Sequence, residues 1–370
     1  MNPISQVRQS DYSSTRHPSS KPPALGEDPR SMGKILVTGA SGFIGGHLAR
    51  QLASEGHDVR CLVRSSSRIE RLRSPGIERV EGDVTSESGL AAALERVDTV
   101  FHLAGLTCAL NDRDLFRVNG EGMDKLLRAC SAIESPPRVV AASSIAAAGP
   151  VEPNAMRSES DPPGPVSRYG ASKLEGERAA ARWADRLPIT IVRPGIVFGP
   201  YDVGMHPIAQ SLYRWRLHVN PGFRSPRLSF IHVDDLIRVM RLAAERGERL
   251  APPGANAEPG RGIYFGVVRE YLTYEELGHK LAEGIVPDRA IRVVRLPRAV
   301  LWSAAAANEL VSRARGRAHL FNRDKIREGT APGWVCSGEK ARTGLGFEPA
   351  HPLRERLRAT GAWYREERWV

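Results

Sequence analysis

Tyr169 and Lys173 are the residues of this chain whose types and spacing most directly suggest chemistry. Residues four apart on a helix share one face, so a phenol and an ammonium would lie side by side. A phenol with a pKa of about 10 is almost wholly protonated at neutral pH, and a fixed lysine can favour its ionised form. The pair therefore predicts a proton donor and acceptor, although the spacing alone also fits a solvated polar face of a helix.

A glycine-rich segment upstream gives this pair a context. An apolar run at 35–38 ends in a turn that contains Gly39, Gly42 and Gly45, and helical periodicity follows. This pattern predicts a strand, a tight turn and a helix N-terminus. In such a turn, glycines let the backbone approach a pyrophosphate, whose charge meets unpaired amides and the positive end of the helix dipole. The spacing is Gly-x-x-Gly-x-x-Gly rather than Gly-x-Gly-x-x-Gly.

With both motifs in place, the chain resembles the extended short-chain dehydrogenase/reductase family, also called the NAD-dependent epimerase/dehydratase family. The resemblance runs from about Gly33 to the C-terminus. Further shared motifs begin at Gly82, Val100, Val118, Val139, Arg193 and Ile231. The C-terminal part is similar to that of 3β-hydroxysteroid dehydrogenase-like and dihydroflavonol reductase-like members, which generally act on apolar or polycyclic hydroxyl and keto compounds.

The resemblance implies a set of catalytic roles. Ser144 would hydrogen-bond the substrate oxygen, Tyr169 would transfer the proton, and Lys173 would lower the phenol pKa and hold the nicotinamide ribose. Asn119 would be a supporting polar group, or simply a helix cap. Ser143 competes with Ser144, but the family motif places its serine five residues before a glycine, here Gly149, which favours Ser144.

The resemblance also implies a cofactor-binding set at the carboxyl ends of the strands. Asp83 would contact the adenine amine, or would be only a turn residue. The full set expected to bind the cofactor is Gly39, Ser41, Gly42, Phe43, Ile44, Gly45, Arg64, Asp83, Val84, Leu103, Ala104, Gly105, Tyr169, Lys173, Pro194 and Val197.

The end of the second strand bears on the choice between NADP and NAD. NAD-preferring proteins carry an acidic residue there, which binds the ribose hydroxyls. Here Val63 is followed by Arg64, three serines and Arg68. A guanidinium beside hydroxyls suits a 2′-phosphate. We therefore expect NADP, with NAD as the alternative if Arg64 stacks on the adenine ring and Ser65 serves either ribose.

Strand-like runs alternate with helical stretches over the first half of the chain. The expected strands are 35–38, 59–63, 77–81, 99–103, 139–142 and 189–192, and the expected helices between them are 87–95, 115–131 and 168–185. This alternation predicts a parallel sheet covered on both faces. The fold class is thus α/β, a Rossmann-type doubly wound sheet with a smaller, discontinuous C-terminal substrate lobe.

We place the domain boundaries from these patterns. The cofactor domain is expected at 33–198 plus 228–246, and the substrate lobe at 199–227 plus 247–370. Two isolated strand candidates, 262–267 and 291–294, fall in that lobe. Residues 1–32 are rich in Ser, Pro and charge and are expected to form a disordered extension, with Met32 as a candidate start instead of Met1.

Composition narrows the possible partners. The net charge of +11 and the pI of about 9.8 could attract nucleic acid or anionic membrane, but no nucleic-acid motif accompanies them. No apolar run is long enough to span a membrane and no secretory signal is evident. Four cysteines without Cys-x-x-Cys spacing and ten scattered histidines predict no metal site and a reducing cytoplasm. The resemblance implies a homodimer.

A basic cluster follows a predicted helix at 297–311. Its members are Arg313, Arg315, Arg317, Arg323, Lys325 and Arg327. Together with the helix it could make a weak membrane-surface contact. We favour the alternative of a packed helix followed by a solvated basic turn.

The predicted function is an NAD(P)-dependent oxidoreductase that interconverts a secondary alcohol and a ketone on an apolar small molecule through a Ser-Tyr-Lys site. One alternative is a nucleotide-sugar epimerase with tightly bound NAD. Against it, Ala148 stands where sugar epimerases often carry tyrosine, and Arg227 is one residue out of step with the family's arginine before Phe230. A second alternative is a non-catalytic NADP-sensing protein.

Overall fold

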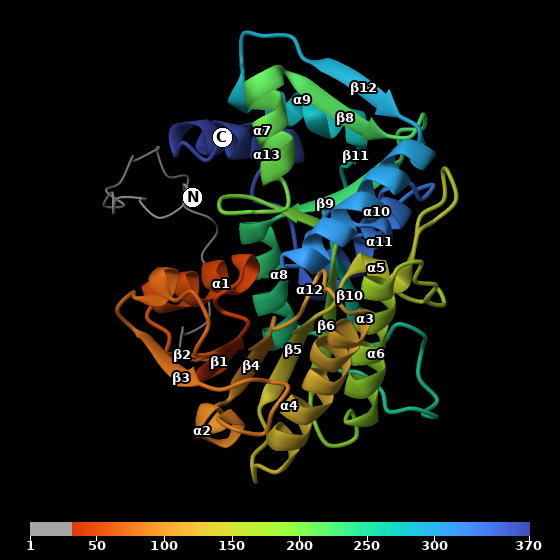
Figure 1. The fold of residues 1–370 in the computed structure, drawn as a ribbon. Helices are drawn as coiled ribbons and strands as arrows, with labels where there is room; N and C mark the ends of the chain where they lie inside the picture. The colour runs from red at the N-terminus through yellow and green to blue at the C-terminus, as the bar shows by residue number, and fades with distance from the viewer. Residues whose placement is uncertain (1–31) are drawn as a thin grey trace.

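A computed structural model describes residues 32–370 and places a seven-stranded sheet at the centre of the molecule (Figure 1). The strand order is β10-β6-β5-β4-β1-β2-β3, and every neighbouring pair is parallel. The strands are β1 (Ile35–Thr38), β2 (Val59–Val63), β3 (Ile77–Glu81), β4 (Thr99–His102), β5 (Arg138–Ala142), β6 (Ile189–Pro194) and β10 (Ile263–Gly266). Each of the six predicted runs forms a strand whose ends lie within two residues of the prediction.

Helices cover both faces of this sheet because its strands are apolar on both sides. Ile35 and Val37 face one layer and Leu36 the other. The first layer holds α1 (Phe43–Ser54) and α8 (Val233–Arg246), and the second holds α2 (Leu90–Leu94), α4 (Gly122–Ser131) and α6 (Arg168–Arg182). Each large apolar side chain buried in this way contributes about 1.5–3 kcal/mol. The predicted doubly wound fold is confirmed.

The helix predicted at 115–131 is longer and is not regular throughout. It begins as α3 (Asp112–Phe116), passes through a π-helical turn, η3 (Arg117–Glu121), and continues as α4. Such single π turns occur frequently at functional sites. The helix predicted at 87–95 is shorter, because Gly89 precedes α2 in the left-handed conformation at φ 76°.

Much of the C-terminal part of the chain forms a smaller lobe above the carboxyl edge of the main sheet (Figure 1), whereas α12 (Glu339–Leu345) packs against α8 and β10. A three-stranded sheet combines β7 (Ile196–Phe198), β9 (Arg227–His232) and β11 (Tyr271–Thr273), and β8 (Leu217–Pro221) pairs with β12 (Arg292–Leu296). The remaining helices are α5 (Ile145–Ala148), α7 (His206–Trp215), α9 (Tyr274–Ile285), α10 (Arg298–Ala314), α11 (Arg323–Gly329), α12 (Glu339–Leu345) and α13 (Leu353–Glu366), and η2 (Glu70–Leu72) is a 3₁₀ turn.

The structure corrects two of the predicted boundaries. Residues 263–266, assigned to the substrate lobe, form β10 of the main sheet, because the apolar run pairs with the otherwise open edge of β6. Met32, assigned to the extension, is buried, and its carbonyl accepts a hydrogen bond of 2.8 Å from Thr99 Oγ1. The rest of the predicted extension and the choice of start lie outside the described residues.

Within residues 32–370, no helix is both long and apolar enough to cross a bilayer. In the same range, no three His, Cys, Asp or Glu side chains gather as a metal site would require. The four cysteines are free thiols.

Candidate active site

The glycine turn after β1 forms a cradle into which no larger residue fits. Gly39 has φ +72°, and a Cβ atom there would lie 2.5 Å from the Ala104 nitrogen. A Cβ atom on Gly45 would lie 2.4 Å from the Gly39 oxygen. Gly42 precedes α1 without a side chain to cap it, which leaves the first-turn amides available to an anion. These features fit the pyrophosphate of a dinucleotide.

A crevice of about 240 Å³ lies at this cradle. The expected cofactor residues that line it are Gly39, Ser41, Gly42, Arg64, Asp83, Val84, Leu103, Ala104 and Gly105. The residues that line it without having been predicted are Thr38, Leu62, Ser67, Gly82, Leu106 and Val118. Phe43, Ile44 and Gly45 form the first turn of α1. Pro194 is the buried last residue of β6, and Val197 lines a second cavity instead.

Two of the residues that line the crevice, Arg64 and Asp83, carry charged side chains. Arg64 is exposed immediately after β2, and its backbone N–H donates to Ser67 Oγ at 3.1 Å. Asp83 Oδ1 accepts hydrogen bonds from the backbone and side chain of Thr85, at 2.8 and 2.9 Å. Asp83 is therefore a turn residue that also lines the crevice.

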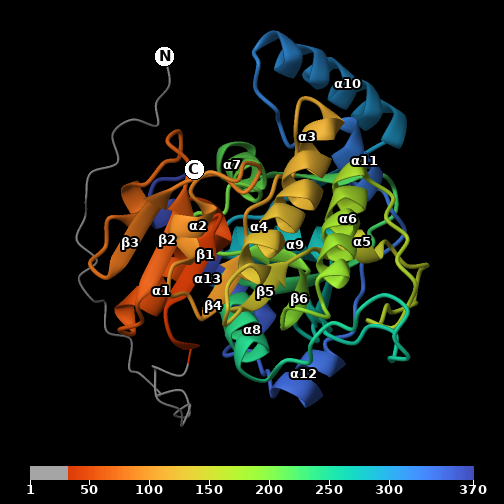
Figure 2. The same cartoon turned by 90° about the horizontal axis from the view of Figure 1, so that it is seen from below.

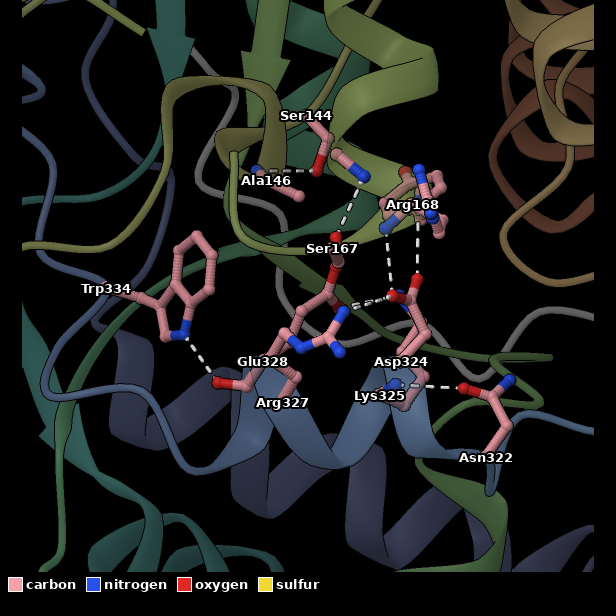
Figure 3. Close-up of polar contacts among 12 residues, drawn as sticks. Ser144, Ala146, Ser167, Arg168, Asn322, Asp324, Lys325, Arg327, Glu328 and Trp334 are labelled. Atoms are coloured by element: carbon pink, nitrogen blue, oxygen red, sulfur yellow. Dashed lines mark hydrogen bonds and ion pairs between the residues drawn. The ribbon is translucent and has the colours of Figure 1, made fainter. Parts of the chain in front are cut away.

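Ser144 and Tyr169 line the second cavity, which has a volume of about 630 Å³. Ser144 caps α5, and its Oγ accepts from the Ala146 N–H at 3.1 Å (Figure 3). Tyr169 lies in the first turn of α6, which Ser167 caps. Ser143 donates instead to Glu177 Oε1 at 2.5 Å. Of the two candidate serines, Ser144 lines the cavity and Ser143 is hydrogen-bonded to Glu177.

Lys173 is held at the end of β5. Its Nζ donates to the Ala142 carbonyl at 2.6 Å. Burial lowers the pKa of this lysine to about 8, and the negative charge of Glu177 acts against that decrease. Glu177 is itself fixed by a buried bidentate pair with Arg193, at 2.8 and 2.6 Å. Gly105 of the crevice lies beside Lys173, since a Cβ atom there would be 3.5 Å from Nζ.

The electrostatic surroundings of Tyr169 differ from the expectation. Burial raises the pKa of its phenol, and the Lys325 ammonium and the Ser144 hydroxyl oppose the rise. We expected Lys173 to lower this pKa. In the structure Lys173 donates to a carbonyl, and it is Lys325 Nζ that lies over the phenol ring, 4.2 Å from its centroid.

Asn119 lies in the π turn η3 and connects three segments. Its Oδ1 accepts from the Leu106 N–H at 2.8 Å, and its Nδ2 donates to the Leu106 carbonyl at 2.9 Å and to Ser172 Oγ at 2.8 Å. The side chain therefore ties the segment after β4, which lines the crevice, to helix α6. It does not cap a helix.

Helix α11 contacts the first turn of α6 through three side chains (Figure 3). Asp324 accepts from the backbone N–H groups of Arg168 and Tyr169, at 2.8 and 3.1 Å. Glu328 accepts from the Ser167 hydroxyl and from Lys325 Nζ, the latter at 2.7 Å. None of these residues was predicted to belong to the site, because the basic cluster around Lys325 suggested a solvated turn. The spacing of Lys325 and Glu328 on one short helix was the available signal.

Apolar side chains form most of the wall of the 630 Å³ cavity. They include Ile145, Ile196, Val197, Met205, Ile208, Leu228, Leu277, Leu320, Phe321 and Trp334. Trp334 is held in place by a hydrogen bond from its Nε1 to the Glu328 carbonyl at 2.9 Å. Arg227 lies elsewhere, with its guanidinium 5.6 Å from the centre of the Tyr271 ring. A cavity of this kind suits an apolar ligand with few polar groups.

Similarity to known proteins identifies the family of this chain. Residues 35–255 match the NAD dependent epimerase/dehydratase family. The chain belongs to this family. A putative dihydroflavonol 4-reductase from Synechocystis sp. is 32% identical over 221 residues, which cover 58% of this chain and 64% of that protein. This match confirms the resemblance to dihydroflavonol reductase-like members.

Two further proteins match this chain over most of their length. A ceramide reductase from Caulobacter vibrioides is 28% identical over 342 residues, 91% of this chain and 96% of that protein. A solved structure of UDP-glucuronic acid 4-epimerase from Bacillus cereus in complex with NAD superimposes with a TM-score of 0.70 over 90% of this chain and 99% of that chain, at 21% identity. That likeness shows the shared fold.

Proposed function

We propose that this family member is an NAD(P)-dependent oxidoreductase that interconverts a secondary alcohol and a ketone on an apolar small molecule. The observation that carries the proposal is that Ser144 and Tyr169 both line one cavity with a largely apolar wall, while Lys173 lies beside Gly105 of the glycine crevice. A nicotinamide cofactor bound in that crevice supplies the hydride. The ceramide reductase, similar over nearly its whole length, supports a lipophilic substrate.

Residues of this chain would orient the substrate, transfer the proton and bind the cofactor. The Ser144 hydroxyl orients the substrate oxygen and donates a hydrogen bond to it. Tyr169 gives its phenolic proton to that oxygen in ketone reduction and takes it back in alcohol oxidation. Lys173 binds the cofactor ribose through its ammonium. The apolar wall excludes water from the reacting atoms.

The position of Arg227 favours this reaction over sugar-nucleotide epimerisation. An epimerase of this fold needs a cation for the substrate pyrophosphate, and Arg227 instead stacks on Tyr271. Among residues 32–370, no arginine lines the cavity, and its one lysine is paired with Glu328. A purely cofactor-sensing protein would have no use for the Ser144, Tyr169 and Lys173 set.

We propose NADP as the cofactor because Arg64 offers an exposed guanidinium at the end of β2. An Arg64→Ala variant should lose about tenfold or more in NADPH affinity, since a hydrogen bond to a charged group contributes about 1.5–3 kcal/mol. Its NADH affinity should change little. Arg79→Ala, an exposed arginine on β3, is the matched control. Equal loss for both cofactors, or an unchanged preference, would remove the 2′-phosphate assignment.

The experiment that tests the substrate class combines retained ligands with turnover. Small molecules that copurify with the protein are identified by mass spectrometry, and oxidation of NADPH and NADH is then followed across lipophilic ketones and nucleotide sugars. NADP with a lipophilic alcohol or ketone supports the proposal. A retained nucleotide sugar with NAD, or turnover of nucleotide sugars alone, contradicts it.

A weak contact with an anionic membrane surface is also part of the proposal. Val300, Leu310 and Val311 of α10 are exposed, and Arg315 and Arg317 follow the helix. Helix α10 stands out from the body next to α3 and α11 (Figure 2). The four free thiols support a reducing, cytoplasmic location. The homodimer remains an expectation from the family.

A further inference from the structure

We propose that Lys325 is a positioning residue for Tyr169, and that its ammonium, supplied by the substrate lobe, stabilises the phenolate that Tyr169 uses as the base in alcohol oxidation. This inference rests on the proposed function. Lys325 Nζ lies 4.2 Å from the centre of the Tyr169 ring, within the range of a cation–π contact. A cation held there favours the ionised form of the phenol.

The Lys325 ammonium is held by an ion pair. Glu328 accepts its hydrogen bond at 2.7 Å, and both side chains are largely buried, with exposed fractions of 25% and 14%. Glu328 also accepts from Ser167, the N-cap of α6, and its carbonyl accepts from Trp334. Lys325 is thereby oriented by contacts that lead to the tyrosine helix itself.

The backbone of α6 is held by the same short helix. Asp324 accepts from the N–H groups of Arg168 and Tyr169, and Glu328 accepts from Ser167, so α11 contacts three consecutive residues at the start of α6. These groups lie 155 to 161 residues apart in sequence. The contacts between α11 and α6 therefore place the cation over the phenol.

The other charged or titratable groups around this pair are few. Asp324 and Glu328 come from α11, and Cys108 comes from the segment after β4, where the Lys325 ammonium acts to lower the pKa of its thiol. Lys173 lies four residues after Tyr169 on α6. Asp202 and His319 line the same cavity. Burial and the negative charge of Glu328 both raise the pKa of Tyr169, while Lys325 is the cation that lowers it. Removing Lys325 should therefore shift the phenol titration to higher pH.

The test is the pH profile of alcohol oxidation, which needs the ionised phenol. In wild type, kcat/KM should rise with pH as the phenol ionises. In Lys325→Met this rise should occur at higher pH, so that kcat/KM is about tenfold lower than in wild type at pH values below the rise and recovers at high pH. Lys325→Arg keeps the charge and should restore the rise to its wild-type position. Lys280→Met, which removes a lysine paired with Glu283 on α9, should leave it in place.

A measurement without turnover separates this inference from the proposed function. With ¹³Cζ-labelled tyrosine, the resonance absent in Tyr169→Phe should titrate at higher pH in Lys325→Met than in wild type, as long as the variant remains folded by circular dichroism. An unmoved titration, or a loss of rate that is equal at all pH values, overturns the inference while leaving the reductase assignment intact. Full activity of Tyr169→Phe would instead overturn the proposed function.

Discussion

The side chain of Lys173 is half-buried at the carboxyl end of β5, and its ammonium loses its proton at an unusually low pH. Burial lowers the pKa of its ammonium to about 8, since the charged form is costly away from water. Its Nζ donates to the Ala142 carbonyl, the carboxylate of Glu177 favours its charged form, and Gly105 lies beside it. The charge that is proposed to hold the cofactor ribose is therefore present at neutral pH and is lost in mildly alkaline solution.

This property predicts a pH-dependent cofactor affinity. As pH rises above about 8, the dissociation constant for NADPH should increase by up to tenfold per pH unit, because binding then requires uptake of one proton. Lys173→Arg, which stays charged, should show an almost flat dependence. Titration calorimetry between about pH 6.5 and 9.5 measures both. A flat wild-type curve would mean that Lys173 does not contact the cofactor through its charged form.

At the scale of single elements, the π turn η3 is the feature that most directly couples fold to site. It places Asn119 where one side chain bonds the backbone of Leu106 and the hydroxyl of Ser172. The sequence identified Asn119 as a polar residue of a family motif. It did not reveal the π geometry, because the local pattern reads as a continuous helix through 115–131.

An Asn119→Ala substitution tests this coupling. It would leave the Leu106 amide and carbonyl without their side-chain partner, at a cost of about 1–3 kcal/mol in the free energy of unfolding. NADPH affinity should also fall, since Leu106 lines the crevice. Urea denaturation and equilibrium binding measure the two effects. Asn256→Ala, at an exposed position, should change stability by less than about 0.5 kcal/mol. Equal effects of the two substitutions would contradict the role given to Asn119.

At the scale of the whole molecule, local sequence patterns predicted where strands and helices lie better than they predicted which elements pair or pack together. The six N-terminal strands follow from short apolar runs that end in turns, and these also place the glycine cradle. The strand character of 262–267 was predicted, but its pairing with β6 depends on a sheet edge more than 60 residues earlier. The position of Lys325 could not be predicted for the same reason. The basic residues around it suggest a solvated turn, and only the packing of α11 on α6 places its ammonium over Tyr169.

The outward face of α10 predicts a property of the molecule as a whole. The protein should co-sediment weakly with vesicles that contain phosphatidylserine and much less with phosphatidylcholine alone. An Arg315→Glu, Arg317→Glu double variant should lose about 2 kcal/mol of this binding, since each basic residue near an anionic surface contributes about 1 kcal/mol. Arg354→Glu, Arg358→Glu on α13 is the control. Binding that ignores lipid charge, or the same loss in both variants, would refute the contact.

The most direct test of the account is the single substitution Tyr169→Phe. It removes the phenolic proton and leaves the ring beneath Lys325, so NADPH binding measured by calorimetry should be retained. The rate of NADPH-dependent reduction of a lipophilic ketone should fall at least about 100-fold, the smallest effect usual for a lost general acid. A variant that binds NADPH normally and reduces the ketone at the wild-type rate would contradict the assignment of Tyr169 as the proton donor.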